Sequence, residues 1–174
     1  MKDVELRLIS ELMKNSRRSD RDLAKALDVS QPTVTRIRTR LEREGYIREY
    51  TMIPDFNRIG YEISSITFAK LKSGLSPEEL EKTRKMARAM EKETAFESIV
   101  IAKGLGCNSD LVIVSFHENY GAYSKFIDML KSFPNVDLTN FNSFVISLSQ
   151  EHYRLLTFKT LSKHILTLEK NQVQ

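Results

Sequence analysis

Two patterns of apolar residues divide the chain. In residues 3–45, apolar side chains recur every three or four positions, which is the spacing of one buried helix face. In residues 61–150, runs rich in β-branched and aromatic residues alternate with helical stretches, which is typical of strands joined by helices. These patterns predict an α+β protein with a helical domain at 1–60 and a mixed domain at 61–150.

Capping residues set the limits of the helices in the first domain. A first helix is predicted from Asp3 to about Lys14, with apolar residues on one broad face. Ser19 is followed three residues later by an acid, as in a capping box, so a second helix begins there. Ser30 caps a third helix, which ends at Gly45 because glycine is a good helix terminator.

The second and third helices form the helix-turn-helix pattern, in which the later helix enters the DNA major groove. Val34, Ile37 and Leu41 form the buried stripe of this third helix. The residues between Ser30 and Leu41 include three arginines and no acid. The opposite side and its flanks are therefore predicted to contact DNA: Gln31, Pro32, Thr33, Thr35, Arg36, Arg38, Thr39 and Arg40. The alternative is a charged surface helix of a bundle.

Basic residues gather on both sides of this predicted reading helix. The formal net charge is only +4, so its placement is more informative than its size. Residues 14–25 hold five basic residues against two acids, and residues 36–48 repeat that excess. Such excesses suit contacts with phosphates, and we expect them from Arg17, Arg18 and Arg48. Double-stranded DNA is the predicted partner.

Few residues of this chain suggest other chemistry. Cys107 is the one cysteine, which excludes an internal disulfide and a cysteine-rich zinc site. His117, His152 and His164 show no metal-ligand spacing, and there is no nucleophile elbow, HExxH or Walker motif. No apolar run approaches the roughly 20 residues that span a bilayer. We therefore predict a cytoplasmic protein that is not an enzyme, with no metal, no cofactor and no membrane partner.

The remaining elements complete a two-domain prediction. Residues 46–53 alternate like a strand and are interpreted as the wing of a winged helix. The mixed domain is predicted as a strand at 63–72, a helix at 76–93, strands at 95–103 and 111–117, a helix at 120–132 and a strand at 136–148. This order is βαββαβ, the ferredoxin-like split arrangement.

The stretch LAKALDVSQPTVTRIRTRLEREGYIREYTMIPDFNRIGYE resembles the N-terminal domain of the Lrp/AsnC family of prokaryotic transcription regulators. The matching residues are Leu23, Ala24, Ser30, Val34, Leu41, Glu42, Gly45, Ile47, Tyr50, Pro54, Ile59 and Gly60. The pair Ile37-Arg38 departs from it, because many members have a basic residue followed by an aliphatic one. The resemblance implies a DNA-binding regulator whose C-terminal domain pairs subunits into a homodimer or larger assembly and often binds an amino acid.

A glycine-rich segment is the predicted place for that effector. Family members carry a short Gly-x-x-Asp turn between the second and third strands, and here Gly104 and Asp110 are interpreted as the ends of a longer loop. The candidate ligand-binding residues are Gly104, Gly106, Asn108, Ser109 and Asp110. A plain hairpin turn is the alternative.

Residues 151–174 extend beyond the usual fold of the family. Phe158, Leu161, Ile165 and Leu168 have the spacing of one helical stripe, so the extension is predicted to be helical. We expect this helix to pack on its own domain or on a dimer mate; docking to another protein is the alternative.

An enzyme is the alternative function, since sirohaem decarboxylase subunits resemble the same architecture. Those proteins are rich in aromatic and His/Arg pocket motifs, whereas this chain has no tryptophan and three scattered histidines.

Overall fold

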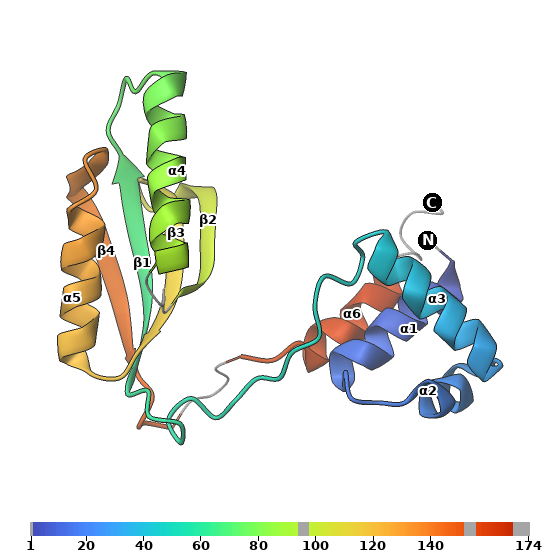
Figure 1. The fold of residues 1–174 in the computed structure, drawn as a ribbon. Coiled ribbons are helices and arrows are strands. Elements are labelled where there is room, and N and C mark those ends of the chain that lie inside the picture. Colours follow the sequence, from blue (N-terminus) through green and yellow to red (C-terminus); the bar gives the residue numbers. More distant parts are fainter. Residues whose placement is uncertain (1, 94–97, 152–155, 169–174) are drawn as a thin grey trace. The chain divides into compact units, whose positions relative to one another are not determined.

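The computed structural model describes residues 2–93, 98–151 and 156–168 of the chain. It forms two compact units, one of residues 1–54 with 153–174 and the other of residues 55–152. The first unit, called the head below, contains α1 (Asp3–Lys14), α2 (Asp20–Leu27), α3 (Gln31–Arg43) and α6 (Lys159–Leu168). The second, called the sheet unit, contains β1 (Ile63–Leu71), α4 (Pro77–Glu93), β2 (Ser98–Gly106), β3 (Ser109–His117), α5 (Tyr120–Lys131) and β4 (Val136–Ser147) (Figure 1).

The helices of the head begin and end at the residues that the capping pattern predicts. The Ser19 hydroxyl accepts a hydrogen bond from the Asp22 N–H at 3.2 Å, and the Ser30 hydroxyl accepts one from the Thr33 N–H at 3.3 Å. Asp28 adopts a left-handed conformation, with φ 55°, in the turn between α2 and α3. After α3, Gly45 has φ 76°, and the Tyr46 N–H donates to the Leu41 carbonyl, which is the Schellman ending.

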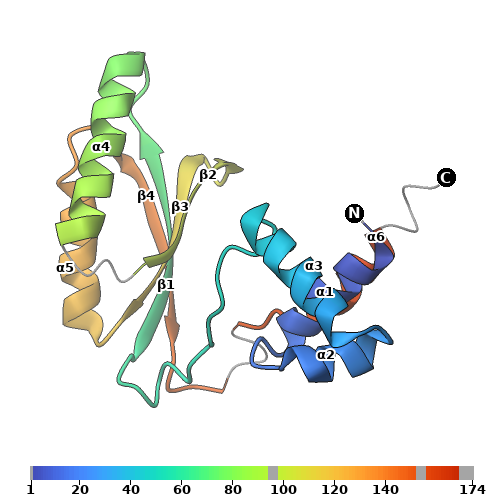
Figure 2. The ribbon, with the colours of Figure 1, turned by 45° about the vertical axis from the view of Figure 1, so that its right-hand side comes forward.

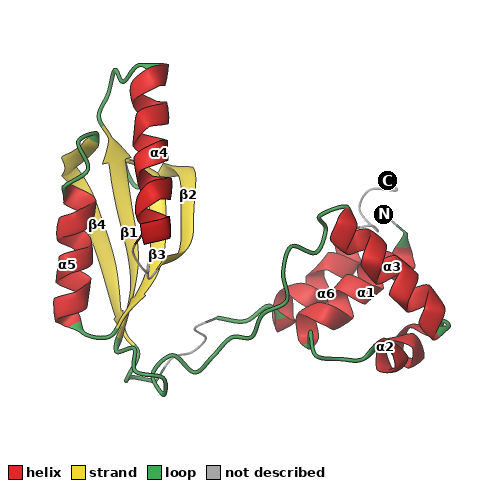
Figure 3. Ribbon diagram, viewed as in Figure 1, coloured by secondary structure: helices red, strands yellow, loops and turns green. Residues whose placement is uncertain are grey.

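The sheet unit confirms the predicted βαββαβ order. Its four strands are arranged β2-β3-β1-β4 and all neighbours are antiparallel (Figure 3). Helices α4 and α5 lie along the same face of the sheet (Figure 2). Under α5, Ile113 of β3 packs with Phe126, Ile127 and Leu130. The α+β fold class is therefore confirmed.

The predicted wing strand was wrong. Residues 46–53 contain no strand, and the side chains of Tyr46, Tyr50, Met52 and Ile53 are all more than 40% exposed. A strand needs a partner to accept its backbone hydrogen bonds, and an alternating sequence of eight residues supplies none. The N–H groups of Tyr46 and Ile47 instead donate to the Leu41 carbonyl.

The predicted long loop between the second and third strands was also wrong. The strands continue to Gly106 and resume at Ser109, so the connection is a two-residue turn. Cys107 and Asn108 have φ 51° and 53°, the left-handed values of a type I′ hairpin. The sequence did not indicate this turn because the two glycines before it, Gly104 and Gly106, suggested a looser segment.

The predicted helix of the C-terminal extension is confirmed for Lys159–Leu168, and this helix packs on α1 within the head. The contact centres on two fully buried serines, with the Ser10 hydroxyl donating to the Ser162 carbonyl at 2.7 Å. The predicted apolar stripe does not form this contact as expected, because Phe158 and Leu161 remain nearly half exposed. Small serines allow two helix backbones to approach closely, and an apolar stripe gives no sign of that. No described helix is long and apolar enough to cross a membrane.

Candidate nucleic-acid interface

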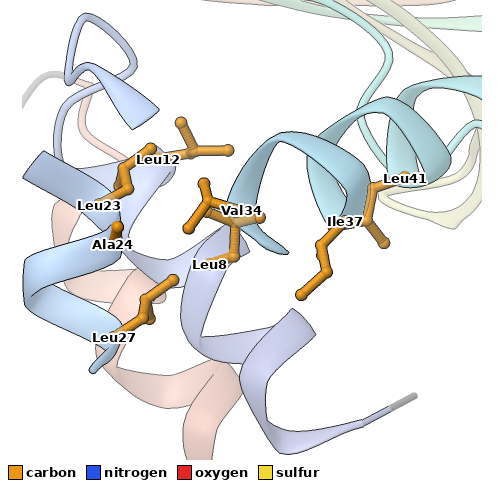
Figure 4. Packing of buried hydrophobic residues seen from close by; sticks show 8 residues of the cluster. All are labelled: Leu8, Leu12, Leu23, Ala24, Leu27, Val34, Ile37 and Leu41. Atoms are coloured by element: carbon orange, nitrogen blue, oxygen red, sulfur yellow. The ribbon is translucent and has the colours of Figure 1, made fainter. Parts of the chain in front are cut away.

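A small apolar core fixes the third helix of the head against the other two. Leu8 and Leu12 come from α1, Leu23, Ala24 and Leu27 from α2, and Val34, Ile37 and Leu41 from α3 (Figure 4). Four of these side chains, Leu8, Leu23, Val34 and Leu41, have no exposed surface at all. Truncating a buried leucine to alanine costs about 2–5 kcal/mol, so the position of α3 is strongly determined.

The side of α3 opposite this core is exposed. Gln31, Pro32, Thr35, Arg36 and Thr39 are all exposed, as the helical periodicity predicts. Pro32 lies in the first turn of α3, where its missing N–H costs nothing. A hydroxyl-rich face with one long cation at its centre can offer hydrogen bonds to base edges, provided that DNA lies against it. This face is called the reading face below.

Three of the predicted DNA-contacting arginines are held by carboxylates of the head itself. Arg38 pairs with Asp20 at 2.9 Å, Arg40 pairs with the buried Glu5, and Arg18 pairs with Glu11. Each of these guanidinium groups links two segments of the head, which the exposed arginines do not do. Among the described residues, these three predicted contacts thus differ from Arg17, Arg36 and Arg48 in having a carboxylate partner.

Arg40 has a structural role in the head, because it pairs with the buried carboxylate of Glu5. Burial raises the pKa of the Glu5 carboxyl, but hydrogen bonds from the Lys2 N–H and from Arg40 outweigh burial and leave this pKa below its usual value. The same reach of Glu5 to the Lys2 N–H, at 3.0 Å, closes the first turn of α1. Glu5 and Arg40 thus tie the start of α1 to the end of α3.

A second cluster ties Tyr50 to the recognition helix α3. The Arg38 guanidinium lies over the Tyr50 ring, 5.9 Å from its centroid, and the Tyr50 hydroxyl donates to the Glu42 carboxylate at 2.7 Å. Burial and this bond to Glu42 raise the pKa of Tyr50 to about 12. Tyr50 therefore anchors residues 46–53 on α3 as a neutral donor.

Other basic side chains of the head lie open to solvent. Arg17, Arg36 and Arg48 are exposed and form no salt bridge with any residue that the structure describes. Arg21 and Lys25 of α2 are exposed as well. These two belong to the basic excess of residues 14–25 but not to the predicted contacts. Their exposure follows from the buried positions of Leu23, Ala24 and Leu27 on the other side of α2.

The candidate effector residues lie on the hairpin of the sheet unit and not in an open loop. Gly104 and Gly106 belong to β2, and Ser109 and Asp110 belong to β3. The Asp110 carboxylate accepts a hydrogen bond from the Leu71 N–H at 3.2 Å. Asn108 accepts one from the Lys70 ammonium at 3.1 Å. The polar atoms of this end of the sheet already take part in local contacts.

Comparison with known proteins now adds to this geometry. Residues 1–48 match a family described as winged helix-turn-helix DNA-binding. An uncharacterized HTH-type transcriptional regulator of Pyrococcus abyssi is 26% identical over 153 residues, covering 88% of this chain and 97% of the relative. The HTH-type transcriptional regulator LrpC of Bacillus subtilis is 37% identical over 70 residues, covering 40% of this chain and 49% of LrpC.

Solved structures share the whole fold. The structure of LrpC from Bacillus subtilis aligns with TM-score 0.67 and 24% identity over 88% of this chain and 99% of that one. An AsnC family regulator from Agrobacterium tumefaciens aligns with TM-score 0.73 and 18% identity over 90% and 95% of the two chains. A transcriptional regulator of Neisseria meningitidis, solved in complex with L-Met, aligns with TM-score 0.70 and 17% identity over 92% and 99%.

The head is thus the DNA-binding domain of a helix-turn-helix protein, followed by a ferredoxin-like unit. The resemblance to the Lrp/AsnC family is confirmed: the chain has the fold of the Lrp/AsnC regulators, and the relatives that it matches are HTH-type transcriptional regulators.

Proposed function

We propose that this chain is a transcription regulator of the Lrp/AsnC type that reads a specific double-stranded DNA sequence through the reading face of α3, as a homodimer whose two heads bind two half-sites. The observation that supports specific reading is the exposure of Thr35, Arg36 and Thr39 on a helix held by a fully buried stripe. Exposed Arg17 and Arg48 are proposed to contact phosphates, which position the head without reading sequence.

Selection of bound duplexes from a random DNA pool tests specific reading with the full chain. A protein that reads base edges enriches one motif, and a two-fold dimer enriches a near-palindrome with half-sites a whole number of helical turns apart. A pool that stays random after repeated rounds, while the protein still binds bulk DNA, would mean that the head binds only phosphates.

The open face of the sheet supports pairing of two copies. Ile113 faces the helices, so its neighbours in β3 face the opposite way. On that opposite face, the register places Val100, Val114, Ile66 and Phe144 in one row across all four strands. Val100 is 40% exposed and Phe144 is 66% exposed. An apolar row of this kind is a candidate interface, and a two-fold homodimer is the commonest assembly that buries one.

Sedimentation of a charged variant tests the pairing. Phe144→Glu should convert a dimer into a monomer with an unchanged circular dichroism spectrum, because a carboxylate would be buried in the interface without a partner. Tyr120→Glu is the matched control: Tyr120 is 68% exposed at the start of α5 and away from the row. Equal masses for the wild type and Phe144→Glu would contradict pairing through this face.

We also propose that an amino acid binds to the sheet unit as an effector. The regulator of Neisseria meningitidis with this fold was solved with L-Met, and the polar hairpin end of this chain holds Lys70, Asn108 and Asp110. We propose this end of the sheet as the effector site. A ligand of the native state raises the melting temperature by mass action, so a thermal-shift screen of the amino acids at millimolar concentration tests it. No shift with any amino acid would leave the hairpin as a structural turn.

A further inference from the structure

An acidic side chain, Asp20, contacts the reading face of α3. Asp20 is the first residue of α2, and its side chain is 18% exposed. The Thr35 hydroxyl donates to one Asp20 oxygen at 2.6 Å, and Arg38 pairs with the other at 2.9 Å. Both partners belong to α3, so a single carboxylate of α2 contacts two residues of the recognition helix.

A carboxylate near DNA would repel the phosphates, and the Arg38 guanidinium offsets this repulsion. This guanidinium balances the Asp20 charge, and its own position is fixed by the Arg18 carbonyl, 3.4 Å away, and by the Tyr50 ring. An ionised carboxylate only accepts hydrogen bonds. The acid can therefore remain near DNA phosphates as half of a neutral pair.

The contact with Asp20 limits the hydrogen bonds that the Thr35 hydroxyl can make with DNA. A threonine hydroxyl has one proton to donate and two lone pairs that accept. The Thr35 hydroxyl donates its proton to Asp20. The Gln31 carbonyl, 3.2 Å away, is a second acceptor within the protein. Thr35 is nevertheless exposed. What it can present outward is an accepting oxygen and a methyl group.

We propose that Asp20 determines sequence specificity by fixing the hydrogen-bonding polarity of Thr35, so that Thr35 accepts from a base and does not donate to one. In the major groove, only adenine N6 and cytosine N4 offer an amino donor, whereas guanine and thymine edges offer acceptors. A base that hydrogen-bonds to Thr35 is thus restricted to adenine or cytosine. Asp20 is a positioning residue here, since it acts through Thr35. The inference rests on the proposed reading of DNA by α3.

Sequence selection with variants tests this polarity. Thr35→Val keeps the shape of the side chain and identifies the base position that Thr35 reads, because the preference there is lost. Asp20→Ala leaves only the more distant Gln31 carbonyl as an internal acceptor, so Thr35 can turn its proton toward the DNA, and guanine and thymine should become acceptable at that position alone. Asp22→Asn is the control, because it also removes one negative charge, two residues away. The Asp22 carboxylate accepts a hydrogen bond from the Ser19 hydroxyl and not from Thr35. This variant should leave the base preference intact. Preference at the position read by Thr39 is an internal control.

A base analogue in the DNA tests, with the wild-type protein, whether Thr35 accepts a hydrogen bond from a base amino group. Replacing the preferred adenine by purine, or cytosine by 2-pyrimidinone, removes only the amino donor. Affinity of the wild type should fall about tenfold, as loss of one base hydrogen bond predicts. A specific site that contains guanine or thymine opposite Thr35, or unchanged affinity for the analogue, would overturn the proposal. If the wild type selects no sequence, the proposed function itself fails, a distinct outcome.

Discussion

Ser162→Leu tests whether α6 is a structural part of the DNA-binding head. Ser162 is fully buried against α1, and the Ser10 hydroxyl donates to its carbonyl at 2.7 Å. Leucine adds two heavy atoms where two helices meet at serines, and overpacking of this kind costs about 1–3 kcal/mol. Since 1.4 kcal/mol is a factor of ten, opening of the contact should become about 5- to 150-fold more frequent.

Hydrogen exchange measured by mass spectrometry resolves the two units, which a single melting curve does not. Peptides from α1 and α6 should exchange faster in Ser162→Leu, and those from the sheet unit should not change. Ser10→Ala should show a smaller effect, about fivefold, because it removes one buried hydrogen bond worth about 1 kcal/mol. Lys163→Leu is the control, since Lys163 is exposed on the same helix. Unchanged exchange of α1 in Ser162→Leu would refute the docking of α6.

Three further predictions concern charges of the head. Arg17→Ala and Arg48→Ala should each weaken binding to specific and random DNA alike, and should reduce the slope of log affinity against log salt by about one. Arg40→Gln should leave that slope unchanged but lower the melting temperature, because it leaves the buried Glu5 carboxylate without its partner. The pKa of Glu5 is lowered in the folded state, so its stabilisation is present above the usual carboxyl pKa of 4.5 and is lost as the pH falls below it. Glu5→Gln should therefore show a smaller loss of stability on acidification, measured by urea unfolding at pH 7 and pH 3.

Local signals explain why much of the fold could be predicted. The caps at Ser19 and Ser30 and the spacing of Val34, Ile37 and Leu41 depend on residues within one or two turns, so sequence alone places α2 and α3. The order of strands and helices in the sheet unit is equally local, and the topology then follows from the short connections.

Pairings between distant residues explain what could not be predicted. The arginines of α3 look alike in the sequence, yet Arg38 and Arg40 are bound by acids 18 and 35 residues away and Arg36 is not. Asp20 gave no signal because its contact with Thr35 crosses the helix-turn-helix turn. The docking of Ser162 against Ser10 spans 152 residues, and two serines carry no hydrophobic pattern.

The affinity of Arg36→Ala for two duplexes tests the central claim, that the reading face of α3 recognises bases. Arg36 is exposed at the centre of that face, whereas Arg43 is 76% exposed at the other end of the same helix and serves as the control for charge. We expect Arg36→Ala to lose about 1–3 kcal/mol, or 5- to 150-fold, on the selected site and much less on a scrambled duplex, since a base contact carries that discrimination. Arg43→Ala should affect both duplexes alike. An equal loss on both duplexes for Arg36→Ala, measured by fluorescence anisotropy at one salt concentration, would contradict base reading by this face.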